Sequence, residues 1–313
     1  MPEKISKNLE FALKVYPVLS EMVPDEFRED FFRKLNSSED VEELLQEGFL
    51  GMHLPAYVLE LARMERRIFE KAQNGDVPST AERLTVNPSL ELFKNCWRNL
   101  VSLVDPLQEN RGPEAGEELV IIWYDPLTDR ARVKAATSED LMVLKMALEE
   151  LDAGEVAREG QTYEAAVHQA VVRALDSGML IGPRAGIFRE FEQKACFSAN
   201  KNFDEARAFT LQWHITQACD FHCRHCYDRD SYASIPPDRG IAVLDDMVQF
   251  CCANHVHGQV TFTGGNPLLH PDFEVLYLAA ADRGFTTAIL GNPSSREEME
   301  RILNIQPPAF FQV

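Results

Sequence analysis

The chain has 313 residues, a length typical of about two domains, and its 45% hydrophobic and 26% charged residues are ordinary globular values. These values exclude collagen-like, low-complexity and wholly disordered chains. The 31 Lys and Arg against 50 Asp and Glu give a net charge of −19, so we expect no nucleic-acid partner. The longest apolar run, residues 119–124, is far below the roughly 18 residues of a membrane span, and no secretory signal begins the chain. We therefore expect a cytoplasmic protein without a membrane partner.

The first half of the chain predicts a helical region followed by a small mixed domain. Residues 1–104 show apolar residues near helical spacing, and the polar, Pro- and Gly-bearing segment 105–117 predicts a boundary. Residues 118–182 predict a hairpin, two amphipathic helices and a short strand, which is a winged-helix pattern. The predicted strands are 119–124, 131–135 and 179–181, and the predicted helices are 138–151 and 163–177.

From residue 209 onward, strands and helices alternate, after a connector at 183–208 with an amphipathic piece at 187–196. Alternating βα units predict a parallel sheet or barrel of the α/β class, with its chemistry at the carboxyl ends of the strands. The predicted strands are 211–216, 259–263, 287–290 and 310–313, and the predicted helices are 238–254, 271–283 and 295–304.

Three of the seven cysteines, Cys219, Cys223 and Cys226, crowd into the loop after the first of these strands. In a reducing compartment such clustered thiols favour a metal site over disulfides. Thiolates are the usual ligands of iron–sulfur clusters, and three of them leave one iron of a four-iron cluster open to a substrate or cofactor. We expect the other cysteines not to be ligands; they are Cys96, Cys196, Cys251 and Cys252.

Zinc is an alternative occupant of this loop, with His214, His222 or His225 as the fourth ligand. A chance group of inert thiols is a further alternative. The second motif, Gly264-Gly265-Asn266-Pro267, follows the next predicted strand. Its glycines would let the backbone approach a ligand closely, although an ordinary turn would also explain a lone glycine pair. The combination of the two motifs favours the iron–sulfur interpretation.

On these motifs the chain resembles the radical S-adenosylmethionine (SAM) superfamily. The cysteine triplet matches the superfamily signature, with His225 where a residue usually packs near adenine. The second motif matches the segment Gly-Gly-Glu-Pro, which meets the methionine amino group, but Asn266 replaces the usual Glu and loses its electrostatic help. Asn292 lies where many relatives have an Asn after the third strand.

The resemblance over residues 209–313 implies a partial (βα)6 barrel with about four strands present. It implies a 4Fe–4S cluster on Cys219, Cys223 and Cys226, with SAM bound to the open iron. A donor such as flavodoxin or ferredoxin would reduce the cluster, and SAM would yield methionine and a 5′-deoxyadenosyl radical that abstracts hydrogen. The implied SAM contacts are Gly264, Gly265, Asn266, Pro267, His225 and Asn292.

Residues 118–182 resemble the winged-helix recognition domain of ribosomally made peptide pathways, which binds a leader peptide as an added strand. Residues 54–65 and 87–90 resemble a helical domain also linked to peptide modification, with a plain helical bundle as the alternative. Taken together, the chain is most similar to the selenobiotic-family peptide radical SAM maturases. The expected partner is a precursor peptide whose leader binds residues 118–182.

Two other hypotheses remain open. One is an iron–sulfur or zinc-dependent winged-helix regulator that acts on DNA, which the second winged helix, residues 163–177, disfavours because Arg173 is its only Lys or Arg. The other is a truncated, catalytically incomplete maturase. Residues 310–313 resemble the opening of a fourth barrel strand, and we expect the barrel to be truncated there.

Overall fold

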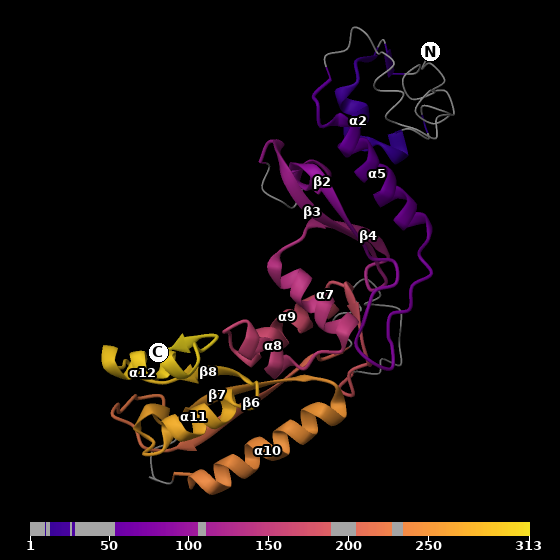
Figure 1. The fold of residues 1–313 in the computed structure, drawn as a ribbon. Helices are drawn as coiled ribbons and strands as arrows, with labels where there is room; N and C mark the ends of the chain where they lie inside the picture. The colour runs from indigo at the N-terminus through magenta and orange to yellow at the C-terminus, as the bar shows by residue number, and fades with distance from the viewer. Residues whose placement is uncertain are drawn as a thin grey trace. The chain divides into compact units, whose positions relative to one another are not determined.

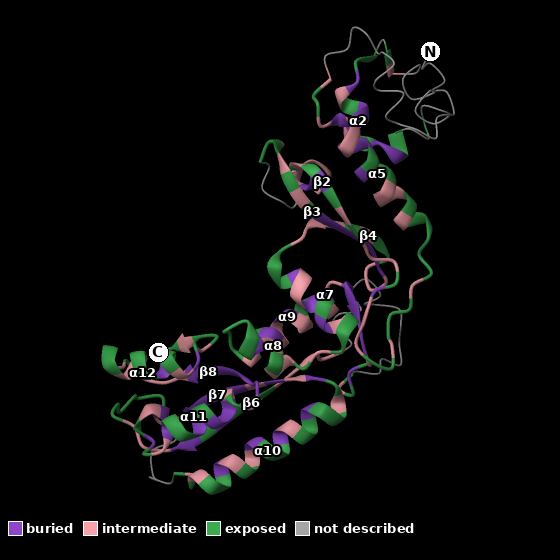
Figure 2. Cartoon of the chain, in the orientation of Figure 1, coloured by how far each residue is buried: buried purple, intermediate pink, exposed green. Residues whose placement is uncertain are grey.

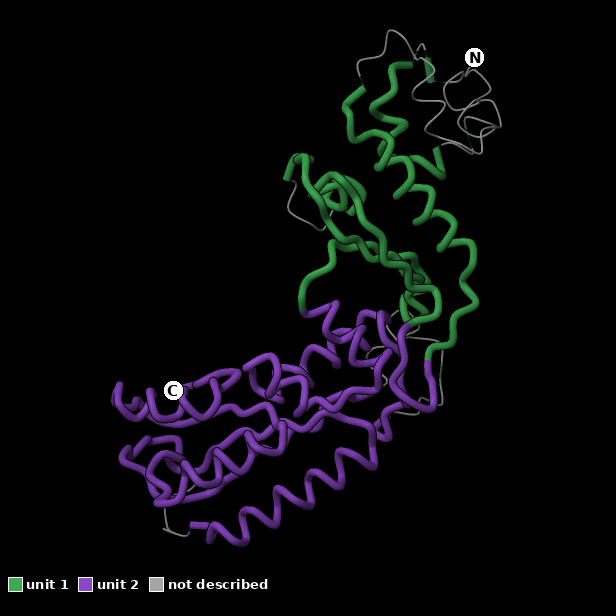
Figure 3. The backbone as a smooth tube through the Cα atoms, viewed as in Figure 1, with its two compact units in different colours: residues 1–79, 87–138 green, residues 80–86, 139–313 purple. Residues whose placement is uncertain are grey.

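In the computed structural model (Figure 1) the chain forms two compact units (Figure 3), namely residues 1–79 with 87–138, and residues 80–86 with 139–313. The structure describes residues 10, 13–25, 27–28, 54–105, 111–188, 205–226 and 234–313. Within these ranges, no helix combines the length and the hydrophobicity that a membrane span requires.

The first unit holds a three-stranded antiparallel sheet in the order β2-β3-β4. Its strands are β2 (Glu91–Arg98), β3 (Glu114–Asp125) and β4 (Arg130–Ala135). The predicted hairpin is confirmed, with Val120 opposite Ala135. The buried Asp125 closes its turn by accepting a hydrogen bond from the Leu127 amide at 2.9 Å. The carboxyl half of β3 is buried (Figure 2).

The prediction that residues 1–104 are helical is wrong over part of that range. The helices there are α2 (Pro17–Met22), α5 (Val58–Gln73) and α6 (Val101–Val104), but β1 (Thr85–Val86) and β2 are strands. Phe93 and Trp97 are four residues apart on β2, and both side chains pack against the hydrophobic core that α5 covers. The alternation of side chains and the pairing with β3 therefore make residues 91–98 a strand, where the sequence predicted a helix.

The second unit begins with the helices that follow the hairpin. They are α7 (Ser138–Glu149), α8 (Ala153–Glu159) and α9 (Glu164–Asp176), followed by β5 (Leu180–Ile181). The two predicted helices and the short strand are confirmed, and β5 pairs with β1. Helix α8 is additional, and Asp152 caps it by accepting from the Gly154 amide at 2.9 Å. The predicted 118–182 domain is thus divided, with its hairpin in the first unit and its helices in the second.

A four-stranded parallel sheet, in the order β6-β7-β8-β9, dominates the second unit. Its strands are β6 (Ala208–Thr216), β7 (His257–Gly264), β8 (Thr286–Leu290) and β9 (Phe311–Gln312). Its helices are α10 (Pro237–Asn254), α11 (Phe273–Ala281) and α12 (Arg296–Ile305), with a 3-10 turn, η2 (Pro267–Leu269), after β7. The predicted alternation is confirmed, and the sheet is that of a partial barrel. Most of the predicted amphipathic piece at 187–196 lies outside the described residues.

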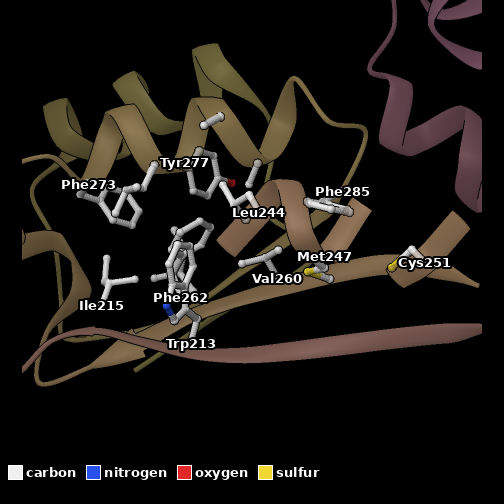
Figure 4. Close-up of a cluster of buried hydrophobic side chains, with 14 of the residues drawn as sticks. Trp213, Ile215, Leu244, Met247, Cys251, Val260, Phe262, Phe273, Tyr277 and Phe285 are labelled. Carbon is white, nitrogen blue, oxygen red and sulfur yellow. The ribbon is translucent and has the colours of Figure 1, made fainter. Parts of the chain in front are cut away.

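All three helices pack on one face of this sheet. Trp213 and Phe262 from the strands meet Phe273 and Tyr277 from α11 (Figure 4), and the ring centroids of Phe262 and Tyr277 are 5.5 Å apart. Because side chains alternate along a strand, the neighbours of these core residues on β6 and β7 point to the opposite face of the sheet. They are the exposed His214 on β6 and the buried Thr261 and Thr263 on β7, so this face of the sheet is polar.

Candidate functional site

The cysteine loop begins where β6 ends, at the carboxyl edge of the sheet. Cys219 is half-buried, whereas Cys223 and Cys226 are exposed, and none of the three forms a disulfide. The Cys226 amide donates to the Cys223 carbonyl at 3.1 Å, and the Phe221 amide donates to Cys219 Sγ at 3.4 Å. Within the described residues, no three His, Cys, Asp or Glu side chains gather to hold a metal ion. The predicted ligands therefore share one loop, but their sulfurs do not converge on one point.

The Gly-Gly-Asn-Pro segment lies directly against this loop. The Gly265 amide donates to the Thr216 carbonyl at 2.9 Å, and the Asn266 amide donates to the Ala218 carbonyl at 2.7 Å. A β-carbon on Gly264, whose φ is +137°, would lie 2.0 Å from the Thr216 oxygen. The glycines thus permit close approach of two backbones, which differs from the predicted approach of backbone to ligand.

The Asn266 side chain is 3% exposed and has partners at both ends. Its Oδ1 accepts from the Leu268 amide at 3.3 Å and so caps η2, which begins at the buried Pro267. Its Nδ2 donates to the Asp220 carboxylate at 3.1 Å. The two partners fix the orientation of the amide, because an ionised carboxylate only accepts hydrogen bonds.

Asn292, just after β8, reaches the same carboxylate. Its Nδ2 donates to Asp220 Oδ1 and lies 3.5 Å from Cys219 Sγ. The hydrogen bond from Asn292, and then that from Asn266, hold the pKa of Asp220 below its usual range, because both favour the charged form. The loops after β6, β7 and β8 therefore meet at Asp220.

Asp220 was not among the residues predicted for the site. The one signal in the sequence was that this acidic residue lies inside the cysteine loop, directly after Cys219. His225 is exposed on the same loop, and its predicted role near adenine stays a prediction.

The residues fit the predicted cofactors by the chemistry of their donors. Three thiols outside any disulfide, on a largely exposed loop, suit iron and sulfide. The carboxylate of Asp220, held by two amides, adds a polar, charged group beside them. For zinc the same finding holds: in the described residues, neither the three cysteines alone nor the cysteines with His214, His222 or His225 gather into a metal site.

A family model, a curated protein and a solved structure each resemble part of this chain. Residues 213–310 match the family model of the radical SAM superfamily. Over 107 residues the chain is 28% identical to an S-adenosylmethionine-dependent nucleotide dehydratase of Selenomonas ruminantium, covering 33% of this chain and 35% of that protein. The structure of Streptococcus suis SuiB bound to S-adenosylmethionine is similar at a TM-score of 0.27 and 13% identity, over 61% of this chain and 43% of SuiB. The chain thus spans about a third of its curated relative.

Proposed function

Because residues 213–310 form a radical SAM domain, a superfamily that uses a 4Fe–4S cluster and SAM, we propose that this chain cleaves SAM reductively to modify a ribosomally made peptide. The observation that carries the proposal is the pair of backbone hydrogen bonds that join Gly265 to the end of β6 and Asn266 to the start of the cysteine loop. The chemistry of the loaded centre is one-electron cleavage of SAM, with the electron from a flavodoxin or ferredoxin, to methionine and a radical that takes hydrogen from the substrate.

Different residues of the chain have different roles in binding the cofactors. Cys219, Cys223 and Cys226 hold the cluster. Gly264 and Gly265 keep the second motif against the loop, and the two amides beside Asp220 orient that carboxylate.

A peptide substrate is supported by strand β4. In the described part of the chain, β4 pairs only with β3, so its outer edge is open for an added strand. Arg130, Arg132 and Lys134 alternate along β4 and therefore share one face, whereas Val133 packs on the core of the first unit. Arg132 already pairs with the buried Asp125 at 2.9 Å, so the exposed Arg130 is the cation that favours an acidic residue in the leader.

The cluster assignment is tested by anaerobic reconstitution with iron and sulfide. Cys223→Ala should abolish the thiolate-to-iron absorption and reductive SAM cleavage, whereas Cys252→Ala, an exposed cysteine on α10, should change neither. Stoichiometric zinc without sulfide in the wild-type protein would overturn the assignment.

The peptide is tested with the full chain, because excising residues 118–182 would remove β2 and β1, the partners of β3 and β5. A leader encoded nearby should bind the wild type and bind Arg130→Glu at least ten-fold more weakly. Binding of duplex DNA instead would favour the regulator.

A nucleotide is a second candidate substrate, favoured by the match to the dehydratase. Reconstituted protein should produce 5′-deoxyadenosine faster when its true substrate is added. A series of nucleoside triphosphates, tested beside the precursor peptide, separates the two candidates.

A further inference from the structure

The short turn η2 has a buried polar residue at each end. Asn266 precedes the turn, and its amide donates to the carbonyl of Ala218, where the cysteine loop begins. His270 follows the turn and is 3% exposed. The His270 amide donates to the Pro267 carbonyl at 3.0 Å, which fixes this residue at the end of η2. The two ends of one rigid turn can therefore hold two different segments of backbone.

Both ring nitrogens of His270 are bonded to backbone. Its Nδ1 accepts from the Asp272 amide at 3.0 Å, and its Nε2 donates to the Ile235 carbonyl at 2.8 Å. Because an amide N–H only donates and a carbonyl only accepts, the two bonds together require the neutral ring with its proton on Nε2. The ring has no nitrogen left for a ligand, so its work is to join segments of the chain.

Ile235 lies where the chain returns from the cysteine loop to the sheet. Its amide donates to the Ile215 carbonyl at 2.9 Å, and the hydroxyls of Thr216 and Ser234 are 2.7 Å apart in an isolated antiparallel bridge. The returning segment therefore lies against the last residues of β6. The loop is held at its start through Asn266 and at its return through His270.

A loop with both ends held has fewer conformations to lose when it closes around a ligand. In the described residues the thiols of the loop do not converge on one point, so binding a cluster requires the loop to rearrange between its fixed ends. We propose, on the basis of the proposed function, that His270 is a positioning residue. By holding Ile235 it closes the cysteine loop and slows the loss of the bound cluster.

Two substitutions separate the two bonds of this ring. His270→Gln places an amide donor near the position of Nε2 but loses the acceptor at Nδ1. His270→Asn keeps an acceptor near Nδ1 but is too short to reach Ile235. Each variant loses one hydrogen bond, so a role in local packing alone predicts equal effects.

The first measurement is iron loss to a chelator after anaerobic reconstitution of the full chain. Loss should be about ten-fold faster in His270→Asn than in the wild type, and His270→Gln should recover most of the retention. His255→Asn changes an exposed histidine at the end of α10 and should lose iron as the wild type does.

The second measurement needs no iron. Hydrogen exchange of the Ile235 amide in the iron-free protein should be about ten-fold faster in His270→Asn than in the wild type or His270→Gln. Ser234→Ala removes a hydroxyl from an exposed position on the same segment and should speed both iron loss and this exchange. It decides the question if His270→Asn does not fold.

Three results would overturn the inference. They are equal iron loss in His270→Asn and His270→Gln, an unchanged exchange rate of the Ile235 amide in His270→Asn, and unchanged rates in Ser234→Ala. A wild-type protein that takes up no iron and sulfide, while the exchange rates differ as expected, would instead overturn the proposed function.

Discussion

A β-carbon added to Gly265 would lie 2.2 Å from the carbonyl oxygen of Ala218, in the cysteine loop. No unstrained structure tolerates that distance, because the obstacle is backbone and cannot rotate away. The segment after β7 and the loop after β6 therefore pack backbone against backbone at Gly265.

Gly265→Ala should push the cysteine loop away from the second motif. We expect it to cost about 1–3 kcal/mol of stability and to lower both the iron content and the SAM affinity. Thermal unfolding, iron analysis and calorimetry measure the three effects. Gly112→Ala is the matched control, since a β-carbon there meets nothing within 4 Å. If Gly265→Ala keeps a full cluster and normal SAM affinity, the contact with Ala218 does not position the loop.

Glu65 should make the first unit less stable as the pH rises. Its carboxylate accepts from the Val18 amide at 2.6 Å and the Leu19 amide at 3.2 Å, but burial raises its pKa from 4.5 to about 7. The folded state then binds the proton more tightly, so the stability that Glu65 contributes is highest below pH 4.5 and falls by up to about 1.4 kcal/mol per pH unit toward pH 7. Denaturant unfolding across this range should show the slope in the wild type and in Glu21→Gln, an exposed control, and lose it in Glu65→Gln.

His257, in the second unit, should act in the opposite direction. Burial, and then the nearby His168 at a ring distance of 5.5 Å, lower its pKa from 6.5 to about 4. Its Nε2 bonds to Thr286 Oγ1 at 2.8 Å, and His168 in turn contacts Glu164. The unfolded state takes up the proton first, so stability should fall as the pH drops from 6.5 toward 4.

The control for His257 is an exposed histidine of the same unit. His257→Gln should remove this part of the acid sensitivity in denaturant unfolding, whereas His255→Asn should keep it. Equal acid slopes in the wild type and His257→Gln would contradict the assignment.

A buried hydrogen-bond network ties α11 to β8 and to the end of α12. Thr287 Oγ1 donates to the Tyr277 hydroxyl at 2.7 Å, and that hydroxyl donates to the Gln306 carbonyl at 2.9 Å. Tyr277→Phe leaves these two buried groups short of a partner and should cost about 1–3 kcal/mol. The exposed Tyr163→Phe should cost far less, and equal losses in urea unfolding would show that the network adds no stability.

Much of the second unit could be predicted because its signals are local. The periodicity of β6 through α12 lies within single segments, and the cysteine loop and the second motif are short continuous stretches. Strand β2 escaped prediction because Phe93 and Trp97 face the core only once β3 pairs beside them. Single-segment periodicity carries no information about such pairing.

The sequence by itself determined which residues could hold a cluster, and that parallel strands would bring the loop and the second motif to one edge. Only the tertiary structure decided that Gly264 and Gly265 face backbone, and that Asp220 joins Asn266 and Asn292. Asp220 is 46 residues from Asn266 and 72 from Asn292. Contacts over such separations depend on how the strands are ordered and in register, and these are properties of the packed sheet that no local pattern records.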